Sequence, residues 1–130
     1  MTCREIYEAA LAMLAESMAS GDNDDYKERA PYLLAAFCTD IKETDAMWRE
    51  ACVEDAQGEW NAVYLPLEDD FPLSDRLAPA AAYYLASMLV LDSNESLSDR
   101  LYDECSDILS RVKEGIPSTA APIINRYAYE

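Results

Sequence analysis

Apolar residues recur every three or four positions in four separate stretches of the chain, and this spacing predicts four α-helices. The first stretch runs from Ile6 to Met18. It follows the pattern Thr2-x-x-Glu5, which is typical of a capping box at the start of a helix. We therefore predict a first helix over residues 3–20.

The second stretch carries its apolar stripe from Tyr26 to Ile41 and predicts a helix over residues 26–45. Pro31 lies inside this stretch and has no backbone N–H to donate. It either marks the true start of the helix or kinks an early turn.

The third stretch, from Leu77 to Leu91, is apolar on nearly all sides, which predicts the most buried helix of the fold. Ser74 is a favourable N-cap residue for it. We predict a helix over residues 75–91, at the centre of the domain.

The fourth stretch begins at Ser96-x-x-Asp99, continues with an apolar row and ends at Gly115. Glycine is common just past a helix end because it reaches positive φ without steric cost. Residues 116–130 contain two prolines and several large apolar residues, and they predict an extended C-terminal arm.

The segment between the second and third helices, residues 46–73, has weak periodicity and predicts an irregular insertion. Val63, Leu65 and Leu67 alternate with Tyr64 and Pro66 there, which favours a short extended or strand segment, with Pro66 confining a strand to a sheet edge. The expected fold is therefore all-α: a domain of about four helices over residues 1–115, carrying the insertion, with the arm beyond it.

The charge of the chain restricts its partners. It contains 10 basic and 26 acidic residues, a formal net charge of −16, spread over both halves. A surface this acidic repels phosphate, so we expect no tight binding to nucleic acid. An acidic surface favours solubility, and it could also contact a basic partner.

The chemistry available to the chain is limited, and we expect neither catalytic residues nor cofactor or metal ligands. There is no histidine among its 130 residues and no glycine-rich phosphate loop. The acidic run Glu68–Asp70 is interpreted as a solvated loop. The four cysteines are too far apart for a metal-binding pair and are expected to be reduced and packed as small apolar residues.

Neither a signal peptide nor a membrane span is expected. The first residues mix charged and apolar side chains, and the apolar stretch 77–91 is shorter than the roughly 20 residues that a bilayer requires. These features favour a protein made in the cytoplasm.

Aromatic residues outside the helical stripes, together with two isoleucines of the arm, are the candidate interface residues, because Tyr and Trp are enriched at protein–protein contacts. The alternative is that they pack on the helices of their own domain. The candidates are Trp48, Trp60, Tyr64, Ile123, Ile124, Tyr127 and Tyr129.

Residues over most of the chain resemble a family of small structural proteins of tailed phages and prophages, the head–tail connector or adaptor proteins. The likeness is carried by Leu67-Glu68-Asp69-Asp70-Phe71-Pro72-Leu73-Ser74-Asp75, by the Tyr83-Tyr84-Leu85-Ala86 core of the buried stretch, and by Leu101-Tyr102 with an inward tyrosine. Ile6, Tyr7, Ala9, Ala10 and Met13, with Tyr26 and Ala30, fit as well.

The resemblance implies a helical, non-catalytic subunit that assembles into a ring beneath the portal, with portal and tail proteins as partners. It implies a location in the virion after synthesis in a bacterial cytoplasm. The alternative is an acidic cytosolic interaction module, such as an adaptor or an inhibitor that mimics DNA. A mimic would concentrate its carboxylates on one face, whereas here they are spread.

Overall fold

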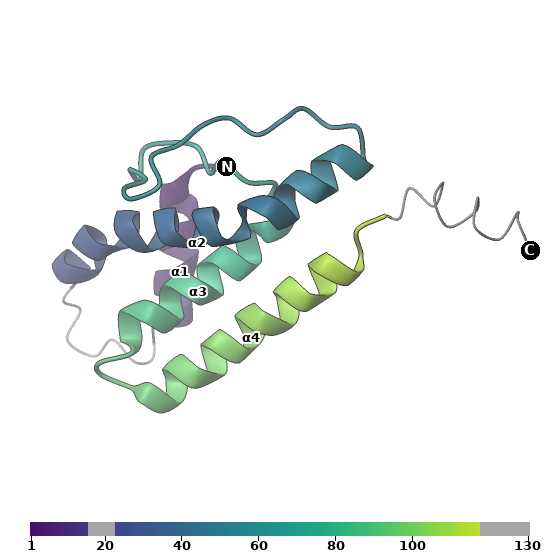
Figure 1. The fold of residues 1–130 in the computed structure, drawn as a ribbon. Helices are drawn as coiled ribbons and strands as arrows, with labels where there is room; N and C mark the ends of the chain where they lie inside the picture. Colours follow the sequence, from purple (N-terminus) through teal and green to yellow (C-terminus); the bar gives the residue numbers. More distant parts are fainter. Residues whose placement is uncertain (16–22, 118–130) are drawn as a thin grey trace, which may run out of the picture.

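The computed structural model describes residues 1–15 and 23–117 of the chain, and this part is mainly α-helical, as the apolar spacing predicted. In order, its elements are α1 (Cys3–Met13), α2 (Asn23–Ala51), a 3₁₀ turn η1 (Asp75–Leu77), α3 (Ala78–Val90) and α4 (Glu95–Glu114). In Figure 1, α2 and α4 lie on either side of α3, and α1 crosses behind them.

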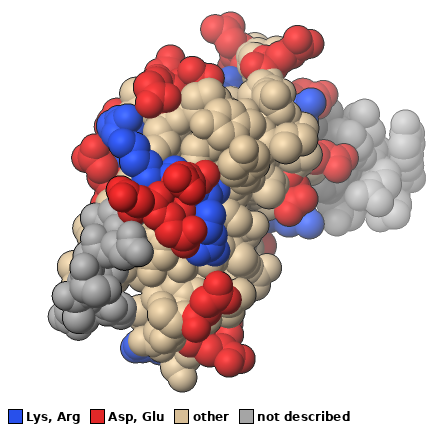
Figure 2. Space-filling view, turned by 90° about the vertical axis from the view of Figure 1, so that its left-hand side faces the viewer, with Lys and Arg blue, Asp and Glu red and all other residues tan. Residues whose placement is uncertain are grey.

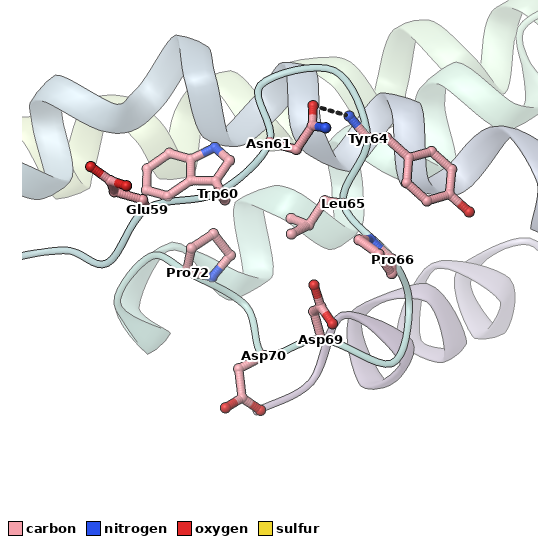
Figure 3. Close-up of a pocket in the computed structure, with 9 residues that line it drawn as sticks. All are labelled: Glu59, Trp60, Asn61, Tyr64, Leu65, Pro66, Asp69, Asp70 and Pro72. Atoms are coloured by element: carbon pink, nitrogen blue, oxygen red, sulfur yellow. Dashed lines mark hydrogen bonds between the residues drawn. The ribbon is translucent and has the colours of Figure 1, made fainter.

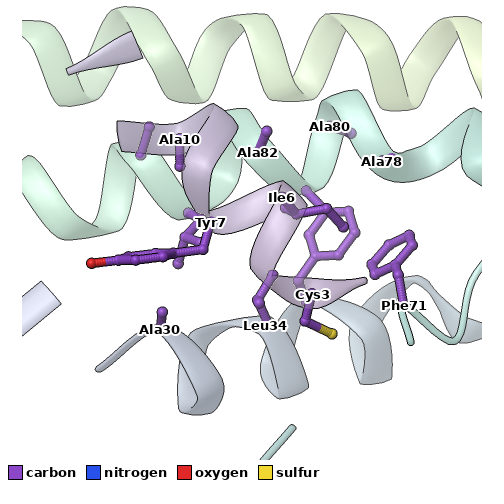
Figure 4. Close-up of a cluster of buried hydrophobic side chains, with 14 of the residues drawn as sticks. Cys3, Ile6, Tyr7, Ala10, Ala30, Leu34, Phe71, Ala78, Ala80 and Ala82 are labelled. Carbon is purple, nitrogen blue, oxygen red and sulfur yellow. The ribbon is translucent and has the colours of Figure 1, made fainter. Parts of the chain in front are cut away.

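The central position of α3 follows from its sequence. Alanines 80, 81, 82 and 86 are buried on several sides of this helix, and their small side chains let neighbouring helices approach closely. Leu85 and Leu89 are also buried. Figure 4 shows Ile6 and Tyr7 of α1 filling the space between α3 and the alanine and leucine side chains of α2. The prediction of a buried third helix is confirmed.

The register of α4 on α3 is set by a buried pair of serines. Ser87 Oγ donates to the carbonyl oxygen of Ser98 at 3.0 Å, and Ser98 Oγ donates to that of Ser87 at 2.9 Å. Each hydroxyl thereby has a hydrogen-bond acceptor in the other helix. This matters because a buried hydroxyl without a partner destabilises a fold. No other sliding position of α4 would preserve both bonds.

The helix ends differ from the predicted ones. The capping box at Thr2 and Glu5 is present, but α1 ends at Met13 rather than at residue 20, and Leu14 is its C-cap; residues 16–20 lie outside the described part. α2 begins at Asn23, contains Pro31, and extends six residues past the predicted end at 45. The apolar stripe stops earlier because Asp45 and Arg49 face a polar loop.

Two capping predictions are corrected and a third is confirmed. The Ser74 hydroxyl makes no capping hydrogen bond, and a 3₁₀ turn precedes α3. α4 is capped by Asn94, whose side chain accepts from the Leu97 N–H, so Ser96 lies inside the helix. Gly115 does end α4, but with φ −79°, in the right-handed region. The absence of a side chain avoids a close contact with the backbone, since a Cβ there would lie 3.2 Å from the Arg111 carbonyl oxygen; the Trp48 indole would be 3.4 Å away.

Of the two alternatives for residues 63–67, the strand is wrong for the described structure, which has only an isolated bridge between Thr2 and Asp70. Leu65 and Leu67 do point inward, but Val63, which alternation would place on the same face, is exposed. Their backbone neighbours, however, belong to helices rather than to a strand.

The loop after α2 is held against the first turn of α1 by backbone hydrogen bonds. The carbonyl groups of Asp69 and Leu67 accept from the N–H groups of Cys3 and Arg4, both at 2.9 Å. The first amides of a helix have no partner within the helix. The loop supplies those partners and is itself fixed by them.

The cysteines are free thiols, and three of them are packed in the core as expected. Cys52 is the exception, because it follows the end of α2 and is exposed. Burial is the main cause that raises the pKa of Cys3 to about 12 and that of Cys105 to about 11. These two thiols are therefore protonated at neutral pH and unsuited to nucleophilic chemistry.

Candidate interaction site on the loop between α2 and α3

Asp45 fixes the loop that carries the candidate site. Its side chain is fully buried, and its two oxygens accept from Arg49 Nε at 2.7 Å, Gln57 Nε2 at 2.8 Å and the Ser74 N–H at 3.0 Å. Burial by itself would raise the pKa of Asp45, but these hydrogen bonds outweigh burial and lower it. A single carboxylate thus joins α2 to both ends of the loop.

Arg49 extends this connection. Its guanidinium also donates to the carbonyl oxygens of Asp55 at 2.9 Å and Pro72 at 3.4 Å. Gln57 donates in addition to the carbonyl oxygen of Lys42. The loop between residues 52 and 74 is therefore held in one conformation without regular secondary structure.

Trp48, the first candidate interface residue, is used within the domain. Its Nε1–H donates to the carbonyl oxygen of Val112 at 2.8 Å, near the end of α4. The Arg76 guanidinium lies over the indole, 4.5 Å from the ring centroid. Trp48 therefore anchors the last turn of α4 to α2.

Trp60 borders a groove of about 470 Å³ on the outer side of the loop. In Figure 3, Trp60 and Pro72 lie on one side of Leu65, and Pro66 and Asp69 lie on the other. Leu65 is buried beneath these residues, whereas Asp69 is exposed. The groove is thus apolar at its base and acidic at its rim.

Tyr64 lies at the edge of this groove and contacts Tyr32 of α2. The two rings pack edge to face with their centroids 4.9 Å apart. Both side chains remain well exposed, at 41% and 54%, and the neighbouring Val63 is 67% exposed. We call these three residues the Tyr32–Tyr64 face. It is the kind of surface that protein–protein contacts favour.

Figure 2 views the molecule from the side on which this loop turns back. Uncharged surface occupies much of the upper part of that view, with acidic and basic groups around it. The remaining candidates, Ile123, Ile124, Tyr127 and Tyr129, lie outside the described residues, as does the predicted arm beyond Pro117.

The sequence interpretation missed the residues that shape this site. Asp45 and Arg49 are four positions apart in one helix, a spacing that can form an ion pair, but nothing in the sequence marks the pair as buried. Tyr32 falls outside the apolar stripe of its helix, which was the available indication that it is exposed. Tyr102, expected to point inward, is instead 46% exposed.

No helix within 1–15 and 23–117 is both long and apolar enough to cross a membrane. Within the same ranges, no three acidic or cysteine side chains are grouped as metal ligands.

Comparison with known proteins gives no relative: no family model, curated protein or solved structure matches this chain.

Proposed function

We propose that this protein is a structural subunit of a phage or prophage particle, a connector that assembles as a ring between the portal and the tail. The observation that carries the proposal is the Tyr32–Tyr64 face, an exposed aromatic surface on a loop that is firmly attached to the helices. Attachment matters because a surface that is already ordered loses little entropy when it docks.

The stretch that carries the phage resemblance builds this loop. Leu67, Phe71 and Leu73 are buried, while the acidic residues Glu68–Asp70 between them are exposed. The stretch therefore presents carboxylates to a partner while its apolar residues hold it in place. Portal and tail proteins, and further copies of the chain, are the proposed partners.

The proposal takes the chain to be non-catalytic and to act by assembly. Its net charge of −16 supports a connector role, since a subunit that lines a passage for DNA should repel phosphate rather than bind it. The proposed location is the virion, after synthesis in the cytoplasm of the host.

The test is assembly of the full chain at physiological salt, alone and with the portal protein encoded near its gene. Light scattering and electron microscopy should detect a closed ring or a portal complex. Tyr64→Ala should weaken assembly, whereas Tyr102→Ala, which removes a similarly exposed tyrosine on α4, should not. A genome without portal or capsid genes nearby, or a chain that neither self-associates nor binds portal, overturns the proposal.

The DNA-mimic alternative is separated by a competition assay. A mimic should displace duplex DNA from a DNA-binding protein, and a connector should not. The chain itself should produce no gel shift of duplex DNA at physiological salt.

A further inference from the structure

We propose that the groove beside Trp60 binds an arginine side chain from an exposed segment of another protein. The proposal concerns the ligand of this groove, and it does not depend on whether the chain belongs to a phage particle. It rests on the shape of the groove, the charge of its rim and the behaviour of the Trp60 ring.

The shape suits a long side chain with an apolar stem. The groove offers about 470 Å³, with Leu65 at its base and Pro66 and Pro72 at its sides. An arginine stem has three methylene groups that pack on such surfaces while the charged end stays near water.

The charge of the rim is entirely negative. Glu59, Asp69 and Asp70 line the groove, and no lysine or arginine does. Among the described residues, none of these three carboxylates takes part in a hydrogen bond or ion pair that would neutralise it. In Figure 3 the Asp69 carboxylate points toward Leu65, across the groove, while Asp70 points away. Asp69 is therefore the carboxylate placed to meet an incoming cation.

The indole of Trp60 already attracts one cation. Lys42 Nζ lies 5.4 Å from the ring centroid, within the range of a cation–π contact. Lys42 lines a separate hollow of about 290 Å³, which Trp60 also borders. Trp60 thus stands between two hollows, one supplied with a cation by the chain itself and one without.

Arginine fits this combination better than lysine. Its planar guanidinium stacks on aromatic rings and donates two parallel hydrogen bonds to one carboxylate, whereas the lysine ammonium is a compact, strongly hydrated charge. A groove with an indole on one side and a carboxylate on the other meets both requirements.

The test uses three blocked tripeptides, acetyl-Gly-Xaa-Gly-amide, in which Xaa is arginine, lysine or citrulline. Citrulline has the shape of arginine without its charge. Binding to the full chain at physiological salt is followed by ¹H–¹⁵N NMR, in which the two tryptophan indole signals report separately. The arginine peptide should shift the Trp60 indole signal, the lysine peptide should shift it less, and the citrulline peptide should leave it unchanged. The Trp48 indole, bonded to Val112, is the internal control.

Matched variants test the contacts. Asp69→Asn should weaken arginine binding about two- to fivefold, the range of an exposed ion pair, whereas Asp99→Asn, which removes one exposed carboxylate from α4, should have no effect. Trp60→Phe keeps an aromatic ring and should also weaken binding, followed in this variant by the backbone amide signal of Leu65 at the base of the groove.

Three results would overturn the proposal. The first is equal binding of the citrulline peptide, and the second is equal loss of affinity in Asp69→Asn and Asp99→Asn. The third is a Trp60 signal that shifts on concentrating the protein alone, which would make a second copy of the chain the occupant.

Discussion

At the scale of single residues, Asp45 has the greatest influence on the structure. It is the only fully buried carboxylate of the described part, and its hydrogen bonds with Gln57 and Ser74 join α2 to the loop. Replacing it removes an acceptor that three donors share.

We predict that Asp45 makes stability depend on acidic pH. Its pKa is lowered in the folded state, so its contribution is present above the unfolded pKa, close to 3.8, and is lost as pH falls through the folded pKa. Between about pH 5 and pH 3, urea denaturation should show the wild type losing more free energy of unfolding than Asp45→Asn does. Asp99→Asn should follow the wild type, and parallel curves for the wild type and Asp45→Asn would contradict the prediction.

At the scale of the helices, α3 is the most buried helix, and Leu85 within it and Leu91, its C-cap residue, make a matched pair. Leu85→Ala should lower the free energy of unfolding by about 2–5 kcal/mol, because it leaves a cavity in the core. Leu91→Ala removes the same atoms from a side chain that is 43% exposed, so it should cost about 0.5 kcal/mol or less. Chemical denaturation measures both, and similar losses would place α3 away from the core.

The end of α4 depends on a contact from another helix. Trp48→Phe removes the hydrogen bond to the Val112 carbonyl, and we expect a loss of about 1 kcal/mol. Amide hydrogen exchange should become faster in the last turn of α4 and remain unchanged in α1. Trp60→Phe, on the loop, should leave exchange in α4 unaltered.

At the scale of the whole molecule, repulsion among acidic side chains is the main electrostatic effect. Ion pairs such as Arg4–Glu68 and Arg76–Glu54 join distant segments, but acidic residues exceed basic ones by sixteen. Much of the repulsion among exposed carboxylates therefore remains uncompensated.

We expect sodium chloride to stabilise the protein. Raising ionic strength from about 0.01 M to 0.1 M shortens the screening length from about 30 Å to 10 Å, less than the size of the domain. The melting temperature, measured by circular dichroism at neutral pH, should rise by a few degrees. An unchanged or lower melting temperature would contradict the prediction.

The sequence by itself determined that there are four helices and which of them is the most buried. Apolar spacing located all four, and the unbroken apolar run placed α3 at the centre, because a helix without a polar side can only be stable when it is surrounded. The sequence also determined the charge and the lack of histidine, which composition fixes before folding.

Only the tertiary structure decided the helix ends, the caps and the loop. Asn94 rather than Ser96 caps α4, and α2 continues past Asp45, because each choice depends on which donor or acceptor another segment brings near. Leu65 and Leu67 alternate as in a strand, but their backbone partners belong to helices. The sequence indicates that Trp48 is an interface residue, whereas in the structure its side chain anchors the end of α4. The local sequence pattern predicts whether a side chain is buried. Which group that side chain contacts depends on residues far apart in the chain, and only the tertiary structure brings these together.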